Sequence, residues 1–136
     1  MENVEINTEN IIKYFDQIKG FISYNDIHIE SLTNDKAVLY ANISENSLNP
    51  GGTVHGGLIF GLADTTMGTL AMTTGKNVMT IDSNINYIKP CTGNIIKCVA
   101  EKVRVGNTIG VYKADIFNSK NELAATITAN YIFIKR

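Results

Sequence analysis

The chain has 136 residues, of which 44% are hydrophobic and 18% charged, with a formal net charge of −1 and a pI near 6.1. This length predicts one domain, residues 1–136, with a sizeable core, and the composition excludes a disordered chain. The small net charge gives no electrostatic reason to expect a nucleic acid or an anionic membrane surface as a partner.

The cysteines and the N-terminus indicate a cytoplasmic protein. Cys91 and Cys98 form neither a CxxC pair nor part of a histidine-rich set, so we expect reduced thiols, no metal site and no disulfide framework. The first residues, MENVEINTENI, are acidic and polar, unlike a signal peptide. The most apolar stretch, residues 58–72, is too short for a membrane span.

The N-terminal third predicts a helix followed by a hairpin. Apolar side chains recur at helical spacing over residues 8–19, with Thr8 as the predicted N-cap and Gly20 as the stop. Two runs with strand-like patterns follow at residues 26–33 and 36–44. A short turn between them favours an antiparallel pair.

Residues 49–72, NPGGTVHGGLIFGLADTTMGTLAM, form the most distinctive stretch. Residues 58–72 predict a helix that is apolar on nearly every side, and such a helix is usually buried all round. Its one charge, Asp64, lies too far inside to cap the helix, and an ionised carboxylate there is costly unless it is paired. The glycine-rich turn before the helix supplies backbone N–H groups where the helix dipole favours negative charge.

The second half of the chain predicts four strands, at residues 78–89, 94–105, 108–118 and 122–134. A change of apolar phase in the second of them indicates a β-bulge near Glu101–Lys102. Repeated hairpins favour an antiparallel sheet. The order of elements therefore predicts an α+β fold in which about six strands curl around one long central helix.

A family resemblance rests on the same stretch. Asn49, the run His55-Gly56-Gly57 and Asp64 resemble, in order and spacing, the N-x-x-G-x-x-H-G-G-x(6)-D signature of hot-dog fold thioesterases. The branch that resembles this chain most contains the phenylacetate-pathway (PaaI-like) acyl-CoA thioesterases and a human acyl-CoA thioesterase. Residues 80–90, TIDSNINYIKP, are similar to the next strand of that branch. The resemblance implies a hot-dog fold, an antiparallel sheet wrapped around the central helix.

The reaction expected from this resemblance is hydrolysis of acyl-CoA to a free acid and CoA, without a metal or an organic cofactor. It needs a hydrogen-bond donor for the developing oxyanion and a group that activates water or attacks the carbonyl. The Gly56 N–H is the natural donor and Asp64 the only acid in reach, and the resemblance assigns the same roles. The residues leave open whether Asp64 attacks the carbonyl itself or activates water.

Spacing along the helix adds a prediction about assembly. Gly56 and Asp64 are eight residues apart in the sequence, which is roughly 12 Å along a helix axis, too far for both to act on one thioester. We therefore expect a homodimer in which Gly56 of one subunit faces Asp64 of the other. A dimer of dimers is the expected tetramer.

Further site residues are assigned by resemblance and position. The resemblance implies that Asn49 and His55 orient the acyl carbonyl and order the turn, and that Thr80 places a hydroxyl near the attacking water. Possible contacts to the acyl group or to the CoA phosphates come from Gly57, Phe60, Met67, Lys89, Arg104 and Asn107.

Each assignment has a structural alternative. A lone aspartate in an apolar helix can pair with a buried lysine, a histidine beside two glycines can act as a cap, and Met67 can simply fill the core. Two other functions are kept as alternatives. One is a non-catalytic acyl-CoA binding or sensor module. The other is a hot-dog hydratase acting on enoyl thioesters, although the motifs of such hydratases do not match the HGG-x(6)-D run of this chain.

Overall fold

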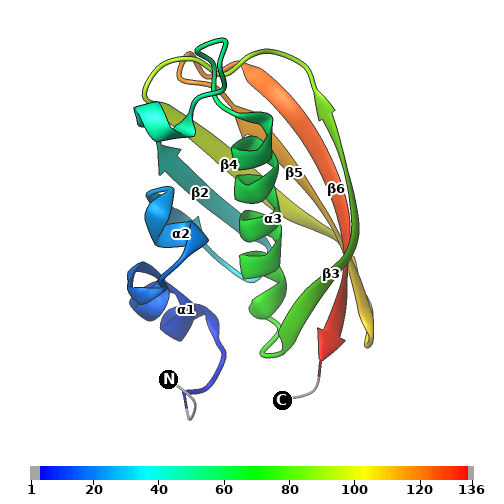
Figure 1. Ribbon diagram of the computed structural model, residues 1–136. Helices are drawn as coiled ribbons and strands as arrows, with labels where there is room; N and C mark the ends of the chain where they lie inside the picture. The colour runs from blue at the N-terminus through cyan, green and yellow to red at the C-terminus, as the bar shows by residue number, and fades with distance from the viewer. Residues whose placement is uncertain (1–3, 135–136) are drawn as a thin grey trace.

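The computed structural model describes residues 4–134 and consists of one antiparallel sheet curled around a long helix (Figure 1). The helices are α1 (Thr8–Tyr14), α2 (Phe21–Tyr24) and α3 (Gly56–Met72), with 3₁₀ turns η1 (Phe15–Gln17) and η2 (Glu45–Ser47). The strands are β1 (Ile27–Leu32), β2 (Lys36–Asn42), β3 (Asn77–Tyr87), β4 (Ile95–Val105), β5 (Ile109–Phe117) and β6 (Leu123–Ile134). Their order in the sheet is β1-β2-β4-β5-β6-β3, so the predicted α+β hot-dog arrangement is confirmed.

The first helix is shorter than predicted. It ends at Tyr14 and passes into η1, so only part of residues 8–19 is α-helical. Asn7 is the N-cap in place of Thr8, because the Asn7 side chain accepts a hydrogen bond from the backbone N–H of Asn10. Gly20, at φ +97°, precedes α2, and its left-handed backbone turns the chain between the two short helices.

The strands follow the predicted pattern closely. β1 and β2 form the expected antiparallel hairpin, and the bulge in β4 lies between Lys102 and Arg104, next to its predicted position. Three further register shifts are not predicted: in β1 between Ile29 and Ser31, in β3 between Thr80 and Asp82, and in β5 between Ile116 and Phe117. Leu123, the first residue of β6, is 37% exposed because it lies at the end of that strand.

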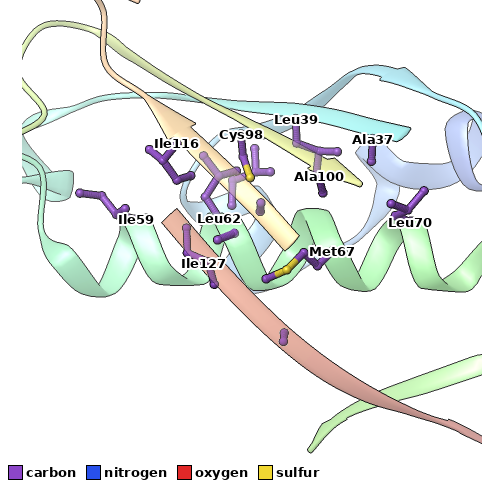
Figure 2. Close-up of a cluster of buried hydrophobic side chains, with 14 of the residues drawn as sticks. Ala37, Leu39, Ile59, Leu62, Met67, Leu70, Cys98, Ala100, Ile116 and Ile127 are labelled. Atoms are coloured by element: carbon purple, nitrogen blue, oxygen red, sulfur yellow. The ribbon is translucent and has the colours of Figure 1, made fainter. Parts of the chain in front are cut away.

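The core lies between α3 and the concave face of the sheet. Leu62, Met67 and Leu70 point from the helix toward β2, β4, β5 and β6 (Figure 2). Small buried residues alternate with large ones along these strands, which lets the helix approach the sheet closely. The small buried residues are Ala37, Ala41, Cys98, Ala100, Ala114, Ala125 and Ala129.

The prediction that α3 is buried on every side is wrong for the single chain. Nine of its residues are buried against the sheet. The other side is only half-buried: α1 and α2 cover part of it (Figure 1), and Thr80 and Tyr131 of the sheet reach it at Asp64. We call this side the open stripe of α3; it consists of Phe60, Gly61, Asp64, Thr65, Gly68 and Met72.

Within residues 4–134, no helix has the length and apolar character needed to cross a membrane.

Candidate active site

The Asp64 carboxylate is held by two hydroxyl groups. Its Oδ1 accepts hydrogen bonds from Thr80 Oγ1 at 2.8 Å and from Tyr131 Oη at 2.7 Å. The Tyr131 hydroxyl also lies 3.0 Å from the backbone carbonyl oxygen of Asp64. Among the described residues no donor contacts Oδ2, so one carboxylate oxygen is fixed and the other is free.

Sheet register explains why both hydroxyls reach the same oxygen. Thr80 of β3 and Tyr131 of β6 are cross-strand partners, and side chains of such a pair point to the same face. The β3 bulge follows immediately after Thr80, as bulges near functional sites often do. Burial and the neighbouring Asp64 carboxylate raise the pKa of Tyr131 well above its usual value, so this phenol keeps its proton and remains a donor.

Asp64 is less buried than its place in an apolar helix predicts. It belongs to the open stripe of α3 and lines a cavity of about 650 Å³ between α3, β3 and the N-terminal segment. No lysine, arginine or histidine in the described part of the chain forms an ion pair with it. Within the described residues, Asp64 therefore does not serve as the ion-pair partner of a buried lysine, which was the structural alternative.

The start of α3 is organised by His55. Its Nδ1 accepts a hydrogen bond from the Gly57 N–H at 2.8 Å, which makes His55 the N-cap and places the proton of a neutral ring on Nε2. The Gly56 N–H donates to no acceptor among the described residues. The helix therefore begins with one capped N–H and one free N–H beside it, a suitable place for an anion.

Two other side chains fix this turn. Asn49 binds both sides of Thr53: its Nδ2 donates to Thr53 Oγ1 at 2.8 Å, and its Oδ1 accepts from the Thr53 N–H at 3.2 Å. Tyr87 donates its hydroxyl proton to the Gly56 carbonyl at 2.7 Å. These bonds hold the glycine turn in place, while the role of Asn49 in orienting the acyl carbonyl stays a prediction.

The predicted site residues fall into two groups. Asp64 and Thr80 line the 650 Å³ cavity, whereas Asn49, Gly56, Gly57 and Lys89 line a second cavity of about 480 Å³. His55 lies between Val54 and Gly56, which line this second cavity. A single chain thus contains both the oxyanion donor Gly56 and the acid Asp64, but they line two different cavities. This agrees with the separation of roughly 12 Å expected along the helix axis.

The remaining candidates are spread over the molecule. Met67 is fully buried in the core (Figure 2) and Phe60 is half-buried, and neither lines a cavity described above. Lys89 pairs with Glu122 at 2.8 Å, beside Ala124 at one end of β6. Arg104 and Asn107 lie toward the other end, roughly 20 Å away along the sheet. A single chain therefore does not bring these three side chains together.

Sequence reasoning missed the role of Tyr131. No catalytic motif includes this residue, and it is buried on the inner face of β6 with 1% exposure. A buried tyrosine hydroxyl nevertheless needs a hydrogen-bond partner. The available signal in the sequence was a tyrosine on the strand face that packs against α3, the helix that carries the lone acid Asp64. Such a tyrosine is a candidate hydrogen-bond donor to that acid.

Neither cysteine is suited to act as a nucleophile. Both are free and buried, and burial raises the pKa of Cys91 and raises that of Cys98 to about 12. Each thiol therefore stays protonated at neutral pH, and Asp64 remains the candidate reactive group.

The fold and the family match together define a hot-dog thioesterase. Residues 51–125 match the thioesterase superfamily, and the chain belongs to that family and is a thioester hydrolase. Mouse acyl-coenzyme A thioesterase 13 is 26% identical, with 87% of each chain covered.

Solved structures share this fold. The Escherichia coli PaaI protein from the phenylacetic acid degradation operon superimposes with a TM-score of 0.87 at 21% identity, covering 93% of this chain and 92% of that one. A thioesterase protein from Streptococcus pneumoniae, solved with coenzyme A, gives a TM-score of 0.77 at 27% identity, covering 81% and 87%.

Proposed function

We propose that the protein hydrolyses acyl-CoA thioesters in a homodimer, with Asp64 of one subunit and the Gly56 N–H of the other at each site. The observation that carries this proposal is the Asp64 carboxylate, held at Oδ1 by two hydroxyls and free at Oδ2, on the wall of a cavity. The coenzyme A bound to the streptococcal relative supports CoA as the thiol. A cytoplasmic location and the absence of any metal or organic cofactor belong to the same proposal.

Two routes use the same atoms. In the first, Oδ2 of Asp64 takes a proton from water while the hydroxide oxygen bonds to the thioester carbon. In the second, Oδ2 itself bonds to that carbon, and water later cleaves the mixed anhydride. In both routes the carbon–sulfur bond breaks, CoA leaves as a thiolate that takes up a proton, and the Gly56 N–H stabilises the oxyanion. Single-turnover hydrolysis separates them, because only the second route acylates Asp64. Mass spectrometry of the rapidly quenched enzyme detects that acylation, and ¹⁸O from labelled water enters Asp64 where water attacks the aspartyl carbon of the anhydride.

The proposed dimer is supported by an exposed apolar edge of the sheet in the single chain. β3 is a sheet edge of eleven residues, and two of its apolar side chains, Met79 and Ile81, are 61% and 50% exposed. Long, apolar edges of this kind invite pairing with another strand. The open stripe of α3 lies beside this edge (Figure 1), so a partner joined at β3 would bring its own α3 alongside.

A dimer of dimers is supported by the outer face of the sheet. Ile109, Ile132 and Met79 are direct cross-strand neighbours on β5, β6 and β3, and they are 44%, 37% and 61% exposed. Contiguous exposed apolar surface is a feature of protein–protein interaction sites. We propose this row as the contact between two dimers.

The first test is thiol release from a panel of acyl-CoA substrates. Asp64→Asn should lower kcat by roughly 100-fold or more, because it removes the base or nucleophile. Binding without turnover in the wild type would favour a sensor module, and hydration of an enoyl-CoA would favour the hydratase. Either result would overturn the proposed hydrolysis.

The second test concerns the shared site. Gly56→Pro removes the N–H at the first helical position, where proline is tolerated, and should cost roughly 100-fold in kcat. Gly56→Ala keeps the N–H and is the matched control, although its Cβ would lie 3.1 Å from the Tyr87 hydroxyl. Random mixing of Gly56→Pro with Asp64→Asn should restore about one quarter of wild-type activity, since half the dimers are mixed and each has one intact site. Subunit exchange without recovery would refute shared sites.

A further inference from the structure

The N-terminal segment forms one wall of the cavity that contains Asp64. The cavity of about 650 Å³ is lined on one side by Asp64, Thr80 and Tyr131 and on the other by side chains of α1, η1 and α2. Figure 1 shows α1 beside the lower half of α3, with β3 on the other side of that helix. The cavity therefore joins the candidate catalytic carboxylate to a segment that no catalytic motif includes.

The wall opposite Asp64 is mainly apolar. Its apolar side chains are those of Ile11, Tyr14, Phe15, Ile18 and Ile22, joined by Met72 and Val78 from α3 and β3, and the polar residues Glu5, Asn10 and Asn77 lie among them. Among the described lining residues the acidic groups are Glu5 and Asp64, and none is lysine, arginine or histidine. A polyanionic CoA moiety has nothing to bind here, because phosphates are held by cations or by backbone N–H groups.

We propose that this cavity is the acyl subsite and that the N-terminal segment makes it selective for uncharged, apolar acyl groups larger than acetyl. The inference rests on the proposed function. The thioester carbon would lie at Asp64 and the acyl group would extend toward α1, while CoA would leave on the open side. A volume of this size is in the range of pockets that enclose drug-sized apolar ligands.

The charge at the end of the acyl group should decide which acyl-CoA substrates the cavity accepts. An acyl group with a terminal carboxylate would place that anion among aliphatic side chains, near Glu5 and without a cation to pair with it. An acyl group of equal length that ends in a methyl group buries the same apolar stem without this penalty. The matched pair hexanoyl-CoA and adipoyl-CoA differs only in this terminal group.

The test compares kcat/KM for that pair in the wild type and in two lysine variants. The wild type should prefer hexanoyl-CoA by at least about tenfold. Ile11→Lys places a cation in the cavity wall and should reduce this preference by about tenfold or more. Ile12→Lys is the matched control, because Ile12 is the next residue of α1, is 48% exposed and does not line the cavity. It should leave the preference within about twofold of the wild type.

A size variant keeps the test decisive if Ile11→Lys does not fold. Ile11→Phe remains apolar, narrows the cavity and should shift the preferred aliphatic acyl chain to a shorter length, whereas Ile12→Phe should not. If the wild type hydrolyses acyl-CoA but the Ile11 and Ile12 variants behave alike, this cavity is not the acyl subsite and the hydrolytic function stands. If the wild type hydrolyses none of the panel, the proposed function itself fails, and this inference fails with it.

Discussion

At the scale of single residues, Asp64 shows how a carboxylate can be positioned without a counter-ion. Thr80 and Tyr131 both donate to Oδ1, so the carboxylate cannot rotate freely and Oδ2 is the oxygen directed to other partners. Tyr131 is itself held by Tyr112, whose ring packs edge-on against it at 5.6 Å. The hydroxyl that orients Asp64 is therefore part of the rigid core.

Tyr131→Phe tests this positioning role. Loss of one hydrogen bond to a charged group costs about 1.5–3 kcal/mol, so kcat should fall by roughly tenfold or more while KM changes little. In an Asp64→Asn background the same substitution should have almost no further effect on kcat. Tyr112→Phe is the matched control, since Tyr112 is equally buried but does not bond to Asp64. An unchanged kcat in folded Tyr131→Phe would contradict the role assigned to this hydroxyl.

At the scale of elements, the N-terminal segment is tied to the sheet by His28. The ring of His28 on β1 bonds to Asp26, at the start of that strand, and to Asp16 in η1. These bonds raise the pKa of His28 above its usual value, mainly through Asp26, and they lower the pKa of Asp26. One cluster thus connects the sheet to the segment that lines the cavity.

The cluster predicts a pH dependence of stability. Because the pKa of His28 is raised on folding, its contribution is complete below its unfolded pKa of about 6.5 and is lost as pH rises through the higher folded value. The contribution of Asp26 is lost only as pH falls below its unfolded value of about 3.9. His28→Gln should therefore lower the melting temperature more at pH 5 than at pH 9. An equal loss at both values, measured by thermal unfolding, would show that the charge of His28 is not involved.

At the scale of the whole molecule, assembly and activity should depend on one edge of the sheet. Both edges, β1 and β3, are free in the single chain, but only β3 lies next to the open stripe of α3 (Figure 1). Dimer formation through β3 would place the glycine turn of one copy near Asp64 of the other. The same contact would therefore cover apolar surface and complete the site.

Ile81→Lys tests this arrangement. Ile81 lies in the β3 bulge, is 50% exposed and has no cross-strand partner on β6, so a lysine there should leave the fold intact but oppose pairing of the edge. We expect a monomer by sedimentation and a loss of roughly 100-fold in kcat, because the oxyanion donor is removed with the partner. Ser31→Lys on the opposite edge, β1, should remain associated and active. A fully active Ile81→Lys monomer would refute the requirement for a partner.

Local patterns in the sequence determined much of this architecture. Alternation along β2, β5 and β6 and the glycine-rich start of α3 depend on neighbours in the chain, and a residue pattern records such neighbours directly. Hence the strands, their hairpins, the bulge in β4 and the candidate pair Gly56 and Asp64 could be predicted. The N-terminal helix was overestimated, because its apolar spacing continues past Tyr14 while its hydrogen bonding changes to a 3₁₀ turn.

Only the tertiary structure decided which residues from distant parts of the sequence contact each other around Asp64. Tyr131 is 67 residues from Asp64 in the sequence, and Ile11 is 53, yet the first bonds to the carboxylate and the second lines its cavity. Such contacts depend on strand register, a bulge and the docking of a short helix, which are properties of packing rather than of any local pattern. The sequence by itself therefore determined the family, the fold and the candidate acid. The three-dimensional arrangement decided which oxygen of that acid is free and which segment surrounds it.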